Sequence, residues 1–165
     1  MRGGPKHFNA GPGPTIYPAD AVVALLVLPG SRYVMQLRDD KPEIIYPGHW
    51  ACFGGAVQPG EAALDTLRRE LREELELEIG EVREFGKFEF DLMAAGLGRF
   101  YRIYFEAPVS PEQVTRLVQH EGAGRRVFEA EELLHTQWVA PHDAFAIWLH
   151  RAGKRVSPAR ITRKL

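Results

Sequence analysis

Three glutamates of this chain are spaced so that they could hold a metal ion together. Glu70, Glu73 and Glu74 lie in the segment RRELREELELE (68–78), three and four positions apart. On a helix such residues are neighbours, so Glu70 and Glu74 repel each other by about 0.2–0.5 kcal/mol. Mg²⁺ binds carboxylate oxygens beside substrate phosphates and would convert this repulsion into attraction.

The surrounding residues predict the helix that this spacing requires. Between Glu61 and Glu78, one apolar stripe is formed by Leu64, Leu67, Leu71 and Leu75. At about 100° per residue, Glu74 lies about 60° from Leu71 around the helix, Glu70 about 100° and Glu73 about 160°. The three carboxylates therefore share one flank that borders the buried stripe. We expect the helix to end near Gly80.

A solvated charged face is the competing explanation of the same residues. Arg69 and Glu73 are an oppositely charged pair four positions apart, and such pairs stabilise exposed helices. The glycines ahead of the helix favour the metal site instead. Gly54 and Gly55 have no side chains that would keep the backbone away from a metal or a phosphate.

The segment GGAVQPGEAALDTLRRELREELEL (54–77) resembles the Nudix box. That pattern is Gly, five residues, Glu, seven residues, Arg-Glu, an aliphatic residue, any residue, Glu-Glu, any residue, Gly and an aliphatic residue. Its places are filled here by Gly55, Glu61, Arg69, Glu70, Leu71, Glu73, Glu74 and Leu77. The late glycine is replaced by Glu76, which predicts that the helix continues toward Gly80 and weakens the match at Leu77.

The resemblance implies a hydrolase that cuts a diphosphate linkage in a small nucleoside diphosphate-X substrate, using Mg²⁺ or alternatively Mn²⁺. Glu70, Glu73 and Glu74 would be metal ligands, together with the backbone carbonyl of Gly54. Arg69 would hold a box carboxylate through a charge-assisted hydrogen bond. Gly55 and Glu61 would lie next to the metal ligands and help to position them without binding the metal themselves.

The general base stays open between two residues in this resemblance. Some members of the family use a box glutamate, which is Glu73 here, and others use a glutamate from a loop after the sheet. Glu121, in HEGAGRRVFEAEEL (120–133), is the loop candidate.

Three further residues are candidates for substrate binding. Arg38 and Arg102 could face phosphate or sugar, or could be ordinary charges on a sheet face. Trp50 could stack on a base, although an aromatic residue at a strand end is more often part of the core.

Two other functions compete with hydrolysis. A catalytically silent Nudix domain would bind a nucleotide or a protein, but it would have no need of the complete glutamate set. A Nudix isomerase would use a cysteine, and Cys52 is the only one. Nucleotides, oxidised nucleotides and nucleotide sugars all remain open as substrates.

The rest of the sequence predicts an α/β (α+β) fold, a Nudix-like α/β/α sandwich with a mixed sheet. The apolar run 21–28 and the alternating runs 32–38, 87–92 and 100–106 predict strands. Residues 39–50 predict a long loop, and AAGLG (94–98) a hairpin loop. Further helices are expected over residues 111–120, 129–134 and 141–152.

Composition predicts a soluble, single-domain protein. The chain has 165 residues, 26% of them charged, and a formal net charge of −1, which gives no bias toward nucleic acid or membranes. A lone cysteine, no secretory signal and no membrane-length apolar run favour the cytoplasm. We expect a flexible arm at 1–15, the Nudix domain at 16–152 and a basic tail at 153–165; the resemblance also allows a homodimer.

Overall fold

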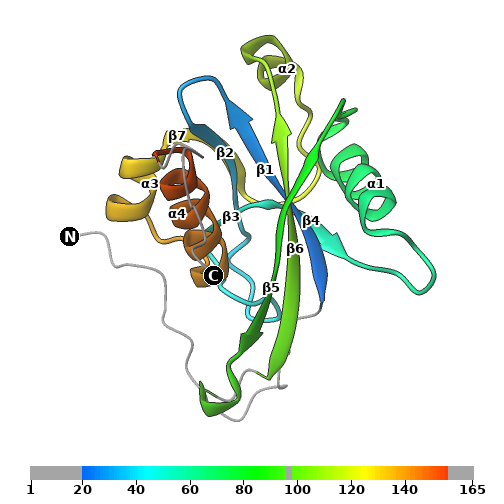
Figure 1. Cartoon of the computed structure of the whole chain (residues 1–165), viewed down its shortest axis with the longest axis vertical. Coiled ribbons are helices and arrows are strands. Elements are labelled where there is room, and N and C mark those ends of the chain that lie inside the picture. The colour runs from blue at the N-terminus through cyan, green and yellow to red at the C-terminus, as the bar shows by residue number, and fades with distance from the viewer. Residues whose placement is uncertain (1–19, 96–97, 156–165) are drawn as a thin grey trace, which may run out of the picture.

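A mixed β-sheet forms the centre of the protein, with helices on both of its faces (Figure 1). The computed structural model describes residues 20–95 and 98–155. The predicted arm at 1–15 lies outside the described residues, and the predicted tail is described only as far as Arg155. The expected mixed sheet and sandwich architecture are confirmed.

The sheet is built around its first strand. Its strands are β1 (Ala21–Leu28), β2 (Arg32–Leu37), β3 (Trp50–Ala51), β4 (Phe53–Ala56), β5 (Arg83–Asp91), β6 (Arg99–Pro108) and β7 (Gly124–Glu129). β1 runs parallel to β6 and antiparallel to β2 and β4. Every residue of β1 is buried because the strand is covered on both faces, which explains its continuous apolar sequence.

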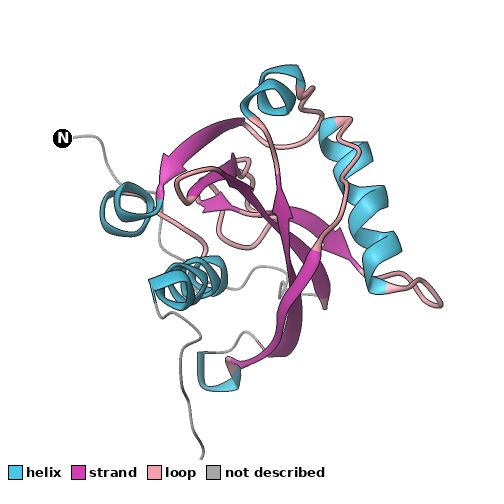
Figure 2. Ribbon diagram, turned by 45° about the horizontal axis from the view of Figure 1, so that its top comes forward, coloured by secondary structure: helices cyan, strands magenta, loops and turns pink. Residues whose placement is uncertain are grey.

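The helices divide between the two faces of the sheet. They are α1 (Ala63–Leu75), α2 (Pro111–Arg116), α3 (Ala130–Thr136) and α4 (Pro141–Arg155), with a short 3₁₀ turn at Met93–Ala95. Figure 2 shows α1 on one side of the sheet and α3 and α4 on the other. None of the helices among the described residues is both long and apolar enough to cross a membrane.

Two cores result from this arrangement, one on each side of β1. Val22, Ala24 and Leu26 face the core under α1, which also contains the leucine stripe Leu67, Leu71 and Leu75. Val23, Leu25 and Val27 alternate with them and face the core under α3 and α4. The alternation of β1 thus puts α1 on one face of the sheet, where it packs against β1 and β4.

The end of α1 corrects one prediction. The helix stops at Leu75, and Glu76 takes the left-handed conformation (φ 54°, ψ 30°), so the predicted continuation toward Gly80 is wrong. This conformation costs a non-glycine residue about 1–2 kcal/mol. The reversal it produces lets Leu77 enter the core at 5% exposure, and burial of a leucine gains about 1.5–3 kcal/mol. Packing of Leu77 therefore decides where the helix ends. Leu77 is buried, as suits the aliphatic position that it occupies in the Nudix box pattern.

Other element boundaries differ from the sequence prediction. β7 was not predicted, yet it pairs with β2 along six residues, with Val127 opposite Val34. Its two arginines, Arg125 and Arg126, hide the strand pattern. α2 ends at Arg116 rather than His120, and α4 extends three residues past Ala152. The loop at 94–98 is described only in part.

Candidate active site

The glycines of β4 bring the strand directly onto α1. Gly54 has φ 137°, and a Cβ there would collide with the carbonyl oxygen of Val22 on β1. A Cβ on Gly55 would overlap the carboxyl group of Glu70. A side chain at Gly54 would meet the backbone of β1, and one at Gly55 would displace the Glu70 carboxyl group, so both glycines let the box glutamates lie against the strand.

The box glutamates are buried in the order that the helical spacing predicts. Glu74 is 6% exposed, the side chain of Glu70 is 16% exposed and that of Glu73 is 59% exposed. The backbone N–H of Gly54 donates to Oε2 of Glu74 at 3.3 Å. The acidic flank therefore begins inside the protein, at Glu74, and opens to solvent at Glu73.

Glu74 is a buried acid among other acids. Its pKa is raised to about 8, mainly by burial and also by the negative charges of Glu121 and Glu70. The Gly54 N–H and the positive charge of Arg38 act in the opposite direction but do not compensate. A cation placed beside this carboxyl group would stabilise its ionised form.

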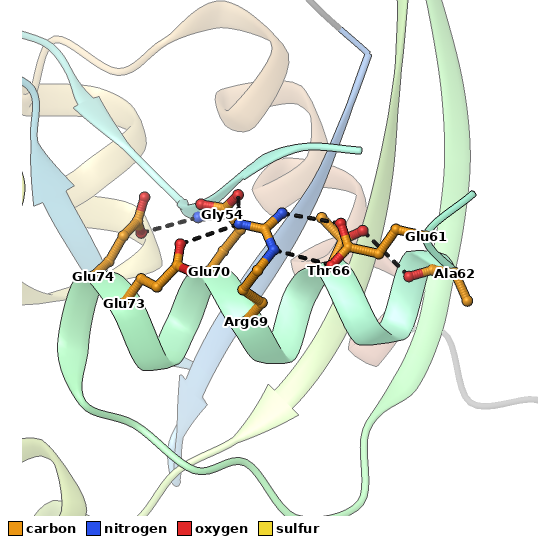
Figure 3. Close-up of polar contacts among 8 residues, drawn as sticks. All are labelled: Gly54, Glu61, Ala62, Thr66, Arg69, Glu70, Glu73 and Glu74. Carbon is orange, nitrogen blue, oxygen red and sulfur yellow. Dashed lines mark hydrogen bonds and ion pairs between the residues drawn. The ribbon is translucent and has the colours of Figure 1, made fainter. Parts of the chain in front are cut away.

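Arg69 connects three of the predicted residues (Figure 3). Its Nε and Nη2 each donate to one carboxylate oxygen of Glu61 at 3.0 Å. Its Nη1 donates to Glu70 at 2.7 Å and to Glu73 at 3.1 Å. The bond from Arg69 lowers the pKa of Glu61 to about 2. Arg69 thus contacts the carboxylates that the resemblance assigns to it, and Glu61 holds Arg69 in place.

The donor chemistry of this flank fits a hard divalent cation. Carboxylate and backbone oxygens are the ligands that Mg²⁺ and Mn²⁺ prefer. Within residues 20–95 and 98–155, no three His, Cys, Asp or Glu side chains converge closely enough to enclose an ion. The reason is visible in Figure 3: Glu70 and Glu73 turn toward Arg69, while Glu74 turns toward Gly54. Arg69 bonds to one oxygen of each of these carboxylates, Oε1 of Glu70 and Oε2 of Glu73, so the other oxygen of each would have to face the ion.

A cavity of about 230 Å³ opens beside β4 and brings predicted residues together from distant parts of the chain. Gly54 and Gly55 form one wall. Arg38 from the end of β2, Arg102 from β6 and Glu121 from the loop before β7 form the others. Local sequence does not predict that these three side chains share one cavity, because they meet only once β2, β6 and β7 have paired and the loops after β2 and before β7 are in place.

Arg102 places a positive charge inside this cavity. Burial lowers its pKa, while Asp143 and Tyr104 act in the opposite direction. Its guanidinium carbon lies 5.0 Å from the ring centroid of Phe100. A buried guanidinium with lowered pKa gains from a negatively charged ligand such as phosphate.

Trp50 is not among the residues that line the cavity. Its ring packs edge-on against Phe128 at 4.7 Å between centroids, and it joins the core under α3 and α4. The structure therefore places Trp50 in the packing role that the sequence offered as its alternative.

Three residues with titratable side chains that sequence analysis did not place at this site also line the cavity. They are Cys52, His142 and Asp143. Asp143 accepts hydrogen bonds from the Tyr104 hydroxyl at 2.7 Å and from the Cys52 N–H at 2.9 Å. These bonds fasten the start of α4 to β6 and to the β3–β4 segment. The Pro-His-Asp sequence at a helix start was visible, but its proximity to the box was not.

His142 is held in an aromatic environment. Burial lowers its pKa, which favours the neutral imidazole. Within the described part of the chain, its Nδ1 has no hydrogen-bond partner. The rings around it belong to Tyr46, Phe90 and Phe100. A polar atom of a ligand in the cavity could pair with Nδ1.

A larger cavity of about 720 Å³ lies between α3 and α4. It is lined mainly by apolar groups, including Phe145 and Trp148, and no box residue reaches it. Glu70, Glu73 and Glu74 are not among the residues that line the smaller cavity, but Glu74 bonds to Gly54 and Glu70 lies against Gly55 in its wall. We place the chemistry there because this wall and the two arginines face the same space.

Comparison with known proteins relates this geometry to a family. The NUDIX domain family matches residues 18–159. Nucleoside triphosphatase NudI of Escherichia coli O1:K1 / APEC is 32% identical over 126 residues, which cover 74% of this chain and 82% of the relative. NudI of Escherichia fergusonii is 44% identical over a shorter stretch of 54 residues, 33% of this chain and 37% of the relative.

Solved structures show the same fold. The solution structure of the E. coli ORF135 protein superposes with a TM-score of 0.68 at 24% identity, over 91% of this chain and 100% of that one. E. coli dihydroneopterin triphosphate pyrophosphohydrolase superposes with a TM-score of 0.65 at 17% identity, over 84% and 99%. At these identities the structures support the fold alone.

Proposed function

Because the chain belongs to the Nudix hydrolase family, we propose that it is a Mg²⁺-dependent hydrolase that cleaves a diphosphate linkage in a nucleoside triphosphate. One observation carries this proposal. A flank of box carboxylates, with Glu74 buried, lies beside a cavity that also contains Arg38 and Arg102. Carboxylates for a metal and guanidinium groups for phosphate are what a diphosphate substrate requires.

The choice of substrate class draws on the relatives. NudI is named a nucleoside triphosphatase, and it shares 32% identity over most of both chains. A triphosphate carries more negative charge than a nucleotide sugar, which suits two arginines at one cavity. Ordinary and oxidised bases both fit this proposal.

Each residue has a distinct task in the proposed reaction. Arg38 and Arg102 bind and orient the phosphates. Glu70, Glu73, Glu74 and the Gly54 carbonyl would hold the cation, which supplies charge neutralisation and lowers the pKa of a bound water. Arg69, anchored by Glu61, keeps Glu70 and Glu73 aligned.

Proton transfer falls to Glu121 or Glu73. Glu121 lies at the cavity and close enough to Glu74 to raise its pKa, so we assign it as the base, with Glu73 as the alternative. The base accepts a proton from water as the water oxygen bonds to phosphorus and the bridging P–O bond breaks. Arg102 or Arg38 stabilises the charge on the departing oxygen.

The isomerase alternative loses support in the structure. The Cys52 side chain is buried, and burial raises the pKa of its thiol well above the usual value. A thiolate would therefore be disfavoured at neutral pH. A silent domain that only binds nucleotide remains the competing candidate.

A substrate panel distinguishes hydrolase from silent domain. Nucleoside triphosphates, oxidised nucleotides and nucleotide sugars are incubated with the protein in Mg²⁺, in Mn²⁺ and in EDTA, and phosphate or pyrophosphate release is measured. We expect metal-dependent release from at least one nucleoside triphosphate. Binding without release under any metal condition would support the silent domain instead.

A further inference from the structure

The loop that carries Glu121 is fastened to the last turn of α1. This loop, residues 117–123, joins α2 to β7. The N–H of His120 donates to the carbonyl of Glu74 at 2.9 Å, and the N–H of Val118 donates to the carbonyl of Leu75 at 3.1 Å. The residue before Glu121 is thus bonded to the backbone of a box glutamate.

A buried glutamine holds the loop from the opposite side. Gln36 lies on β2 and is only 4% exposed. Its Nε2 donates to the carbonyl of Glu121 at 3.1 Å. The side chain of Gln119 donates to the same carbonyl at 2.7 Å. Burying an amide is unfavourable unless it is hydrogen-bonded, and this bond provides one partner for it.

The loop backbone also fits closely against β2. Gly122 has φ 86°, and a Cβ there would lie 2.8 Å from the carbonyl of Leu37 and 2.8 Å from Cγ of Gln36. Ala123 donates its N–H to the same Leu37 carbonyl at 2.8 Å. The chain on both sides of Glu121 is therefore fixed.

Glu76, the residue that departs from the box pattern, makes a third attachment. Its Oε1 lies 2.8 Å from Nε2 of His120. A glycine would adopt the left-handed conformation of this position more easily, but it has no side chain to reach the loop. Glutamate at position 76 is therefore less favourable than glycine for the backbone conformation, but it makes a contact with His120, the residue before Glu121.

We propose that Gln36 and Glu76 are positioning residues that hold Glu121 in place for proton transfer. Gln36 acts on the Glu121 carbonyl, and Glu76 acts through His120. The inference rests on the proposed function, in which Glu121 is the base. Holding a reacting group in its working geometry lowers the barrier because the ordering is complete before substrate binds.

The first test is a double-mutant cycle with Q36M and E121Q. Q36M keeps the side-chain volume and removes the amide donor. We expect kcat for the hydrolysed nucleoside triphosphate to fall by about 10- to 100-fold, as for other residues that orient catalytic groups. KM should stay nearly unchanged, and Q36M should have no further effect when Glu121 is already Gln.

Two outcomes would overturn this part of the inference. One is an equal loss of kcat from Q36M with and without the Glu121 carboxylate, and the other is no loss at all. Q119M, which removes the second donor to the same carbonyl from a more exposed place, repeats the test if Q36M fails to fold. If E121Q leaves kcat unchanged, the inference falls while E73Q still tests the proposed hydrolase.

The second test compares E76Q with the matched variant E78Q. Both remove one exposed negative charge after α1, but Glu78 pairs with Arg72 at 2.6 Å and does not contact the loop. We expect E76Q to lower kcat about two- to fivefold, because an exposed pair contributes little. E78Q should leave kcat unchanged. Equal kcat values for the two variants would exclude a positioning role for Glu76.

Discussion

The acidic flank and the cationic wall of the cavity are built in opposite ways. The flank, defined by Glu70, Glu73 and Glu74, comes from one helix turn and needs only local spacing. The wall, defined by Arg38 and Arg102, comes from the residue after β2 and from β6, and needs the pairing of both strands with β1. We propose that the two regions have separate tasks, the flank in the chemical step and the wall in substrate binding.

The largest expected effect lies on the flank, at Glu73. E73Q removes a proposed ligand that is 59% exposed, so the fold should survive. We expect kcat to fall by between about 100- and 10,000-fold with a small change in KM. Steady-state kinetics and a thermal melt check this prediction. A near-normal kcat would contradict the role of the flank in chemistry.

Glu74 sharpens the comparison because its ionised carboxylate should be needed for metal binding but should destabilise the metal-free protein. Its folded pKa of about 8 lies above the ordinary 4.5, so the folded metal-free protein holds this proton more tightly than the unfolded chain. Metal-free stability should therefore decline as pH rises from about 4.5 to about 8. E74Q should remove this decline and stabilise the metal-free protein at pH 8 by on the order of 2–4 kcal/mol.

Activity should move in the other direction for the same variant. E74Q should lose most of the stabilisation that Mg²⁺ gives and most of kcat. Denaturant unfolding at pH 5 and pH 8, with and without Mg²⁺, measures the pH dependence of stability and the stabilisation by Mg²⁺. Steady-state kinetics measures kcat. If the free energy of unfolding of the metal-free protein depended on pH equally in E74Q and the native protein, Glu74 would not be the buried, metal-binding carboxylate proposed here.

On the wall, Arg102 should control binding. R102M keeps much of the side-chain length but removes the guanidinium, and we expect KM to rise by about 10- to 100-fold. kcat should change less than it does in E73Q. R83M is a suitable control, since Arg83 pairs with Glu106 on the exposed side of the sheet. If R102M lowered kcat without raising KM, Arg102 would act in the chemical step, and the proposed difference in task between flank and wall would be wrong.

The smallest effect is expected behind the wall, at Tyr104. Y104F removes the hydroxyl that donates to Asp143 at 2.7 Å in a fully buried setting. The free energy of unfolding should fall by about 1–2 kcal/mol. KM should rise only a few-fold, because the start of α4 is also held by the Cys52 N–H. Urea unfolding and kinetics test both values; an unchanged free energy of unfolding would remove Asp143 as an anchor.

The flank could be predicted from sequence because helical spacing is local. The leucine stripe fixed which side of α1 is buried, and the observed exposure of Glu70, Glu73 and Glu74 follows the predicted order. β1 was equally clear, since a strand covered on both faces is continuously apolar.

The wall could be predicted only as separate residues. Arg38 and Arg102 were candidates, but strand pairing that brings them to one cavity does not appear in their local sequence. β7 was missed because Arg125 and Arg126 conceal the alternation. The end of α1 was mispredicted because burial of Leu77 outweighs the conformational preference of Glu76.

The central claim is that the carboxylates of the flank, with Glu70 and Glu73 held by Arg69, bind a divalent cation beside a phosphate-binding cavity. A crystal structure with Mn²⁺ and a non-hydrolysable nucleoside triphosphate analogue, with Mn²⁺ located by anomalous scattering, tests it most directly. We predict Mn²⁺ bound by Glu70, Glu73 and Glu74, with phosphates at Arg38 and Arg102. Density showing Glu70, Glu73 and Glu74 without metal, and Mn²⁺ and phosphates bound elsewhere, would contradict the account.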